Sequence, residues 1–358
     1  MENPLGQRLR ELPGPLLLTG HTGFKGTWMT FLLEHLSLPI VGYSLPPDKD
    51  SLFDRAERTG AIPEIFADIR SYETLEEFID EKMPSTIIHM AAQPLVLKSY
   101  ENARETFDVN VMGTVNVLDI AFKKDFVQAV IVVTTDKVYQ NNNSGRAFVE
   151  TDPLEGKDPY SASKVGTEAV VAAWQQIAKV SGGPKVVSVR SGNVIGGGDF
   201  AADRIIPDLI RGVMNSSSIR VRNPKSTRPW QHVMDPLVGY LMCLDLILSE
   251  HTVENLNFGP TSNPMTVDQL IKLSATIFPS VLQLVEFDTV NKIHLEADSL
   301  SLDSSLSKEK LNWMSHWESG QAILKTFAWW RGYLEGRNTA FELCLLDIHA
   351  YLKGESTL

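Results

Sequence analysis

The sequence predicts an α/β fold, in which a doubly wound parallel sheet is followed by a smaller C-terminal α/β domain. Three observations indicate this class. Short apolar runs alternate with longer helical patterns along the first half of the chain. A glycine-rich turn, residues 20–26, follows the first apolar run. The run Ala129–Val133 is apolar at every position, as expected of a parallel strand buried on both faces.

Composition limits the function classes. The chain has 358 residues, 43% of them hydrophobic, so it can bury a large core. Its net charge of −11 argues against a general nucleic-acid or membrane-surface binder. No apolar run approaches the roughly 20 residues of a membrane span, and residues 1–15 lack a signal-peptide core. With two cysteines, Cys243 and Cys344, in apolar patterns and no zinc-type spacing, we expect a soluble cytoplasmic protein without a metal site.

The first strand, residues 15–19, leads into a turn with the spacing G-x-x-G-x-x-G. This spacing is one residue longer than the dehydrogenase fingerprint. Its glycines, Gly20, Gly23 and Gly26, permit a tight turn and close approach of a pyrophosphate to the start of the next helix, where free N–H groups favour anions. The turn therefore predicts a dinucleotide site in a Rossmann-type domain.

The following strands indicate which dinucleotide it is. After the second strand, residues 39–43, no acidic residue stands where the fingerprint expects one, and no Arg pair suits a 2′-phosphate. We therefore expect NAD, loosely held. Asp68 either accepts from the adenine amino group or caps the helix beginning near Ser71. The small residues Ala91 and Ala92 either let a cofactor lie against the backbone or serve close packing.

The candidate chemistry follows the fifth strand. Thr134–Lys137 stand at its carboxyl end, where ligands bind in open α/β sheets. Tyr160 and Lys164 are four residues apart on a predicted helix and so share a face. A nearby ammonium favours the phenolate, although the reference pKa of Tyr is about 10. The pair therefore predicts a base that takes a proton from an alcohol. Asn110, inside a predicted helix, either faces solvent or shapes a site.

The elements become shorter from about residue 192. We therefore predict a domain of residues 1–191 that binds the dinucleotide, a mainly substrate-binding domain of residues 192–337, and a helical extension of residues 338–358 that packs on the body or on a partner. The second domain gathers basic residues within a short span of an acidic protein: Arg204, Arg211, Arg220, Arg222, Lys225 and Arg228. Because Arg forks suit phosphate oxygens, this span predicts a diphosphate pocket.

Four stretches carry a resemblance to a known family: residues 19–26, 89–96, 192–199 and 228–233. On them the chain, over residues 15–332, resembles the extended short-chain dehydrogenase/reductase superfamily and, within it, the CDP-glucose 4,6-dehydratases. Thymidine-linked relatives carry Thr-Asp-Glu after the fifth strand. Cytidine-linked relatives carry Asp-Lys, as Asp136-Lys137 does here.

The resemblance implies a role for each candidate residue. Tyr160 with Lys164 would deprotonate the C4 hydroxyl, Thr135 would hydrogen-bond it, Lys137 would take the C5 proton, and a protonated Asp136 would serve the C6 hydroxyl. Desolvation favours the uncharged form of both Asp136 and Lys137. The NAD-binding residues would be Gly20, Thr22, Gly23, Phe24, Gly26, Asp68, Ile69, Ala91 and Ala92, with Tyr160 and Lys164. The nucleotide-sugar-binding residues would be Gln93, Asn193, Arg204, Arg222, Arg228 and His232.

Two other functions stay open at this point. One is a 4-epimerase, or a 4,6-dehydratase for another nucleotide sugar. The other is a non-catalytic dinucleotide-binding regulator. The helices predicted near residues 101–122 and 161–180 carry apolar residues on more than one face. Relatives pair these helices into a four-helix bundle. We therefore predict a homodimer or higher oligomer.

Overall fold

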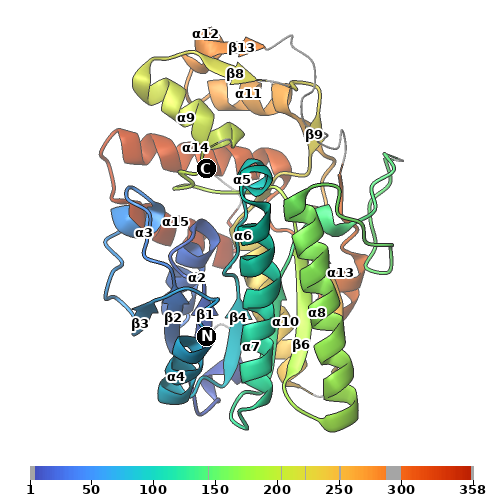
Figure 1. Cartoon of the computed structure of the whole chain (residues 1–358). Helices are drawn as coiled ribbons and strands as arrows, with labels where there is room; N and C mark the ends of the chain where they lie inside the picture. The colour runs from blue at the N-terminus through green and yellow to red at the C-terminus, as the bar shows by residue number, and fades with distance from the viewer. Residues whose placement is uncertain are drawn as a thin grey trace.

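The computed structural model describes residues 5–143, 145–202, 204–221, 223–249, 251–287 and 300–355. A parallel sheet forms its centre, with strand order β11-β6-β5-β4-β1-β2-β3 (Figure 1). The strands are β1 Leu16–Thr19, β2 Ile40–Ser44, β3 Glu64–Phe66, β4 Thr86–His89, β5 Ala129–Val133, β6 Lys185–Ser191 and β11 Asn255–Phe258. The predicted fold class is confirmed.

The strand order reverses between β1 and β4, which lie next to each other although two strands separate them in sequence. In open α/β sheets ligands bind at such a switch point, beyond the carboxyl ends of the strands. The glycine turn after β1, the loop after β4 and the short helix η2 (Asp136–Val138) after β5 all lie at this edge. The sheet topology therefore brings the sequence-predicted cofactor and catalytic residues together.

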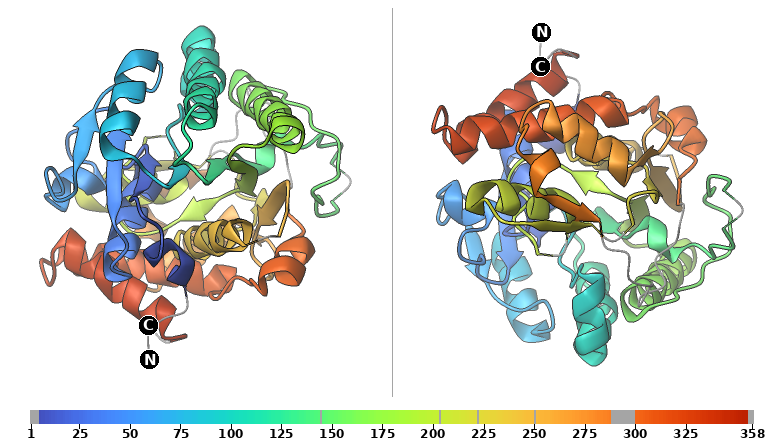
Figure 2. Two further views of the ribbon diagram at one scale, coloured as in Figure 1. Left: turned by 90° about the horizontal axis from the view of Figure 1, so that it is seen from below. Right: turned by 90° about the horizontal axis from the view of Figure 1, so that it is seen from above.

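Helices cover both faces of the sheet (Figure 2). One apolar core forms beneath α4, α7 and α8, and a larger one includes α2, α10, α14 and α15. The helices around the sheet are α1 Gln7–Arg10, α2 Phe24–His35, α3 Leu52–Arg55, α4 Tyr72–Lys82, α5 Val96–Glu101, α6 Ala103–Phe107, the π-helix η1 Asp108–Met112, α7 Gly113–Phe122, α8 Pro159–Ser181 and α10 Met234–Leu248. The predicted helix over 101–122 is thus divided into shorter segments.

A smaller group of elements lies beyond the carboxyl ends of the strands (Figure 1). It consists of β7 Val194–Ile195, α9 Ile205–Asn215, β8 Ile219–Val221, β9 Thr227–Arg228, β10 Gln231–His232, β12 Met265–Thr266, α11 Val267–Ala275, α12 Val281–Leu284, β13 Val285–Phe287 and α14 Ser319–Leu334. Helix α13 Ser305–Leu311 lies instead beside the sheet, against β11 and α10 (Figure 1). The chain returns to the large sheet between these elements, because α10 covers it and β11 pairs with β6. A single boundary at residue 191 therefore does not separate the sheet from the rest.

The C-terminal extension is a helix, α15 Ala340–Leu352, and it packs on the body. Its N-cap Thr339 accepts from the Glu342 N–H, and its buried face contacts α2 and α14. Cys243 and Cys344 are buried free thiols, as predicted. No helix in the described part of the chain has the length and apolar character to span a membrane.

Candidate active site

The turn between β1 and α2 has the shape that a dinucleotide needs. Gly20 has φ 74°, and a Cβ there would lie 2.7 Å from the Ala91 backbone nitrogen. A Cβ on Gly26 would lie 2.1 Å from the Gly20 carbonyl oxygen. Helix α2 begins after Gly23 with no side-chain cap and no acidic residue in its first turn. Its first N–H groups are therefore available to an anion, and these residues fit the pyrophosphate of NAD.

The predicted ribose and adenine side of the site is polar. Thr22 Oγ1 lies 2.7 Å from Ser44 Oγ at the end of β2. The Asp68 carboxylate pairs with Arg70, and this hydrogen bond holds the pKa of Asp68 below its usual range. Asp68 bonds the Arg70 N–H rather than a donor inside α4, so the structure gives it no side-chain capping role. Ile69 is buried.

Tyr160 and Lys164 lie on the first turns of α8. Asp158 and Ser161 form a capping box at the start of this helix and fix Tyr160 in its first turn. Burial raises the pKa of Tyr160 to about 12, and a hydrogen bond with Thr135 opposes the rise. Burial lowers the pKa of Lys164 to about 8. The spacing therefore brings both groups to the carboxyl end of β5, as predicted.

The electrostatic partners of this pair differ from the sequence-based prediction. Lys164 Nζ donates to the Val133 carbonyl oxygen at 3.1 Å. The cation that acts to lower the pKa of Tyr160 is Arg204. A buried ammonium needs an acceptor, and in this structure the strand end supplies it rather than the phenol.

Asp136 is buried against the backbone of Gly192, where an added Cβ would lie 1.7 Å from Asp136 Oδ2. Its Oδ1 accepts from Thr135 Oγ1 at 3.0 Å, and its Oδ2 has no hydrogen-bond partner among the described residues. Burial raises the pKa of Asp136, against opposing effects of Lys137, Thr135 and Arg228. The direction predicted for this carboxyl group is confirmed. We call Thr135, Asp136, Tyr160 and Lys164 the catalytic group.

Two of the predicted arginines lie close to this group. Arg204 donates to Asp199 at 2.8 Å and acts electrostatically on Tyr160. The charge of Arg228 acts on Asp136. Arg222 lies outside the described residues. The basic segment therefore contributes two cations at the edge of the catalytic group.

The other predicted substrate residues are placed differently. The Gln93 side chain is occupied by Leu95 of its own loop and by Thr106 of α6. Asn193 has φ 48° in the loop after β6. His232 is fully buried, with ring contacts to Trp28 and Trp317 and with Asp347 of α15 at 3.7 Å. The structure therefore does not bring the His232 ring to the catalytic group.

Two further residues approach the site and were not among the predicted site residues. Lys25, in the glycine turn, has its pKa lowered to about 7 by burial and by the charges of Lys164 and Arg204. Asn110 lies in the π-helix η1, donates to Ser163 Oγ at 2.8 Å and accepts from the Gln93 N–H at 2.8 Å. Of the two alternatives left open for Asn110, the structure shows the one that shapes the site. The signal for Lys25 is a cation directly before the third glycine of the turn.

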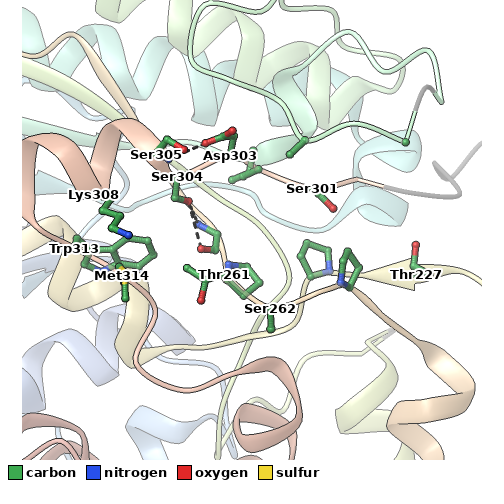
Figure 3. A pocket seen from close by; sticks show the side chains of 17 residues that line it. Thr227, Thr261, Ser262, Ser301, Asp303, Ser304, Ser305, Lys308, Trp313 and Met314 are labelled. Atoms are coloured by element: carbon green, nitrogen blue, oxygen red, sulfur yellow. Dashed lines mark hydrogen bonds between the residues drawn. The ribbon is translucent and has the colours of Figure 1, made fainter.

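A cavity of about 670 Å³ lies apart from the catalytic group (Figure 3). Its walls include Thr227 and Pro229 on either side of Arg228, together with Asp303, Lys308 and Trp313. None of the catalytic group lines it. Because the chemistry-bearing side chains converge at the switch point of the sheet, we place the reaction there and not in this cavity.

Comparisons with known proteins agree with the geometry. The NAD dependent epimerase/dehydratase family matches residues 16–259. A CDP-glucose 4,6-dehydratase of Salmonella typhimurium is 36% identical over 332 residues, covering 90% of this chain and 92% of the relative.

Solved structures with lower identity share the fold. A dTDP-glucose 4,6-dehydratase of Streptomyces venezuelae, with NAD and TYD bound, has a TM-score of 0.78 at 22% identity and covers 90% of this chain and 98% of its own. A UDP-glucose 4-epimerase of Thermotoga maritima has a TM-score of 0.78 at 20% identity, covering 89% and 99%. On the profile match and the Salmonella relative together, the chain belongs to the NAD dependent epimerase/dehydratase family.

Proposed function

We propose that this protein is an NAD-dependent nucleotide-sugar 4,6-dehydratase, and that its substrate is CDP-D-glucose, which it converts to CDP-4-dehydro-6-deoxy-D-glucose and water. One observation carries the proposal. A buried carboxyl group whose pKa is raised by burial, Asp136, lies beside Thr135 and Tyr160 at the switch point of the sheet. Eliminating water needs such an acid, whereas epimerisation at C4 does not. The Salmonella relative supports the same activity and the cytidine nucleotide.

The residues act in sequence on the sugar. Tyr160 removes the proton of the C4 hydroxyl, and Thr135 hydrogen-bonds the same oxygen. NAD, when bound, supplies the acceptor and later the donor of the hydride. Oxidation at C4 makes C5 the carbon α to a carbonyl, and Lys137 then removes its proton. Asp136 protonates the leaving C6 hydroxyl as water departs. The resulting C5–C6 double bond then takes up the hydride at C6 and the proton held by Lys137 at C5.

The cations around the catalytic group have a separate role in the proposal. Arg204 and Arg228 hold the diphosphate, since guanidinium forks match phosphate oxygens. Both act electrostatically on members of the catalytic group, Arg204 on Tyr160 and Arg228 on Asp136. A diphosphate bound there places its hexose next to Tyr160 and Asp136. Asn193 and Gln93 remain further candidates at the same edge.

The test is incubation with NAD and a panel of CDP-, UDP-, dTDP- and GDP-sugars, followed by mass measurement of the products. We expect CDP-glucose to give a product one water lighter. An unchanged mass with an altered sugar configuration would indicate a 4-epimerase. Water loss from another nucleotide sugar alone would mean that the nucleotide is not the cytidine one. No turnover of any sugar would favour a dinucleotide-binding regulator.

We further propose that the protein is a homodimer. The helices near residues 101–122 and 161–180 of one copy would pack against the same helices of the second copy. Large apolar side chains are exposed on α8 and on the segments α5, α6 and η1 that precede α7: Tyr100, Phe107, Met112, Ile177 and Val180. Burying them against a second copy would remove apolar surface from water. Sedimentation at several concentrations tests this, and a concentration-independent monomer would contradict it.

A further inference from the structure

A buried carboxylate with no part in the steps above lies directly behind Lys164. Glu168 follows Lys164 by four residues on α8, so the two share a face. Thr134 Oγ1 donates to it at 2.6 Å, Ser188 Oγ at 2.8 Å, and Arg190 through Nε at 2.8 Å and Nη2 at 2.9 Å. Both carboxylate oxygens are therefore satisfied. We call Thr134, Glu168, Ser188 and Arg190 the Glu168 network.

The network continues a row of contacts between β5 and α8. Three successive residues at the end of β5 meet three residues of α8 spaced one turn apart. Val133 accepts from Lys164, Thr134 donates to Glu168, and Thr135 bonds Tyr160. Of the three α8 residues in these contacts, Glu168 lies farthest from the start of the helix. It therefore fixes the depth and rotation of α8 relative to the strand that carries Thr135 and Asp136.

Glu168 also provides the counter-charge of Lys164. Burial and the charge of Lys164 both lower the pKa values of Lys25 from α2 and His89 from β4. Among the described groups, the carboxylate that acts to raise the pKa of Lys164 is Glu168. Arg190 of β6 pairs with Glu168 from the opposite side. A buried ammonium needs such a carboxylate to stay charged.

We propose that Glu168 is a positioning residue for the reaction, which holds the end of β5 against α8 and keeps Lys164 as an ammonium facing the active site. The catalytic part of this inference rests on the proposed function. Its electrostatic part does not, because it can be measured on the free protein.

The first test measures the titration of Lys164 by NMR of lysine labelled at Cε, with Lys164→Met identifying its signal. Glu168→Gln removes the charge and keeps the shape. We expect the midpoint for Lys164 to fall by about one unit or more relative to wild type, because an opposite charge at this range shifts a pKa by ~1–3 units. The matched control is Glu254→Gln, since Glu254 is exposed and pairs with Lys179 at the far end of α8. An unchanged midpoint in Glu168→Gln overturns the inference.

The second test is the pH profile of turnover. The sign follows from the pKa of Lys164, which burial lowers to about 8. Below that pH the ammonium is present, and above it the charge is lost. In Glu168→Gln the alkaline decline of kcat should move to lower pH with KM unchanged, whereas Glu168→Asp should restore its position. A uniform loss of kcat without a shift would show a merely structural role. Absence of turnover in wild type would contradict the proposed function and leave the NMR result decisive.

A third variant keeps the test open if Glu168→Gln fails to fold with Arg190 unpaired. Thr134→Val removes one hydrogen bond from the network and keeps both charges. We expect a several-fold lower kcat with an unchanged Lys164 midpoint. Its control is Thr326→Val, because Thr326 of α14 is buried and donates to the Ala322 carbonyl oxygen of its own helix. Wild-type kcat in Thr134→Val would overturn the positioning part. Glu168→Gln combined with Arg190→Met repeats the titration without an unpaired charge.

Discussion

The Glu168 network and the catalytic group lie one helical turn apart along the same contact of β5 with α8, yet the pKa values of their carboxyl groups are shifted in opposite directions. Burial acts to raise the pKa of Glu168, but Arg190 and the two hydroxyl donors outweigh it and lower the pKa. Burial also raises the pKa of Asp136, and there the opposing effects are too small to reverse it. Both carboxyl groups are buried, but the groups that bond and pair with them differ. A fully bonded carboxylate anchors the helix, while a carboxyl with an oxygen left over can give up a proton.

The largest expected effect is on the catalytic side of this comparison. Tyr160→Phe removes the hydroxyl group that, in the proposed function, takes the C4 proton as a phenolate, and it keeps the aromatic ring. We expect kcat to fall by about 10²–10⁴-fold, the usual contribution of a general acid–base group, with nearly unchanged binding of the nucleotide sugar. Steady-state kinetics and calorimetric titration measure the two quantities. Tyr72→Phe, on the surface of α4, is the control, and wild-type rates in Tyr160→Phe would remove the residue from the mechanism.

The next largest effect is expected on protein stability, from a variant of the Glu168 network. Arg190→Met leaves Glu168 buried without its cation, and breaking one partner of a buried ion pair costs about 3–5 kcal/mol of stability. Denaturation in urea should show this loss. Arg146→Met breaks an Arg–Asp pair of similar geometry whose arginine is more than half exposed, and it should change stability little. Equal effects of the two variants would mean that the Glu168 pair is not an anchor.

The smallest effect is the dependence of stability on pH. Asp136 has a raised pKa in the folded protein, so the folded state binds its proton more tightly than the unfolded chain, whose carboxyl has a pKa of about 3.9. Stability from this group is therefore lost as pH rises above about 4. Asp136→Asn should gain stability relative to wild type over that range, by at most ~1.4 kcal/mol per pH unit. A difference that is constant with pH would show that Asp136 is charged.

The sequence was sufficient for the parts of the site that depend on local pattern. The apolar run Ala129–Val133 is β5, and the helical spacing of Tyr160 and Lys164 holds in α8. The raised pKa of Asp136 also follows from its place at the end of a buried strand. To predict these features, only two things are needed: the spacing of apolar residues along the chain, and the rule that ligands bind beyond the carboxyl ends of parallel strands.

Features that depend on contacts between segments distant in sequence could not be predicted from local sequence patterns. Glu168 follows Lys164 at helical spacing, but its partner Arg190 comes from β6, and only the sheet order brings the two together. His232 follows a basic segment, yet Trp317 and Asp347 of α15 pack against its buried ring. Likewise β11 joins the sheet after the chain has left it. Pairing between distant strands and helices decides each of these cases.

The central claim, that a neutral Asp136 acts with Lys137 in water loss, is tested most directly by the pair Asp136→Asn and Lys137→Met incubated with NAD and CDP-glucose. Thr135, Tyr160 and Lys164 are unchanged in both, so C4 oxidation should proceed. Water loss should stall, and absorbance of the reduced-nicotinamide band should accumulate. In deuterated water, Lys137→Met should place little deuterium at C5, whereas Asp136→Asn should still exchange it. Normal dehydration by both variants would contradict the claim and require the acid and the base to be other residues.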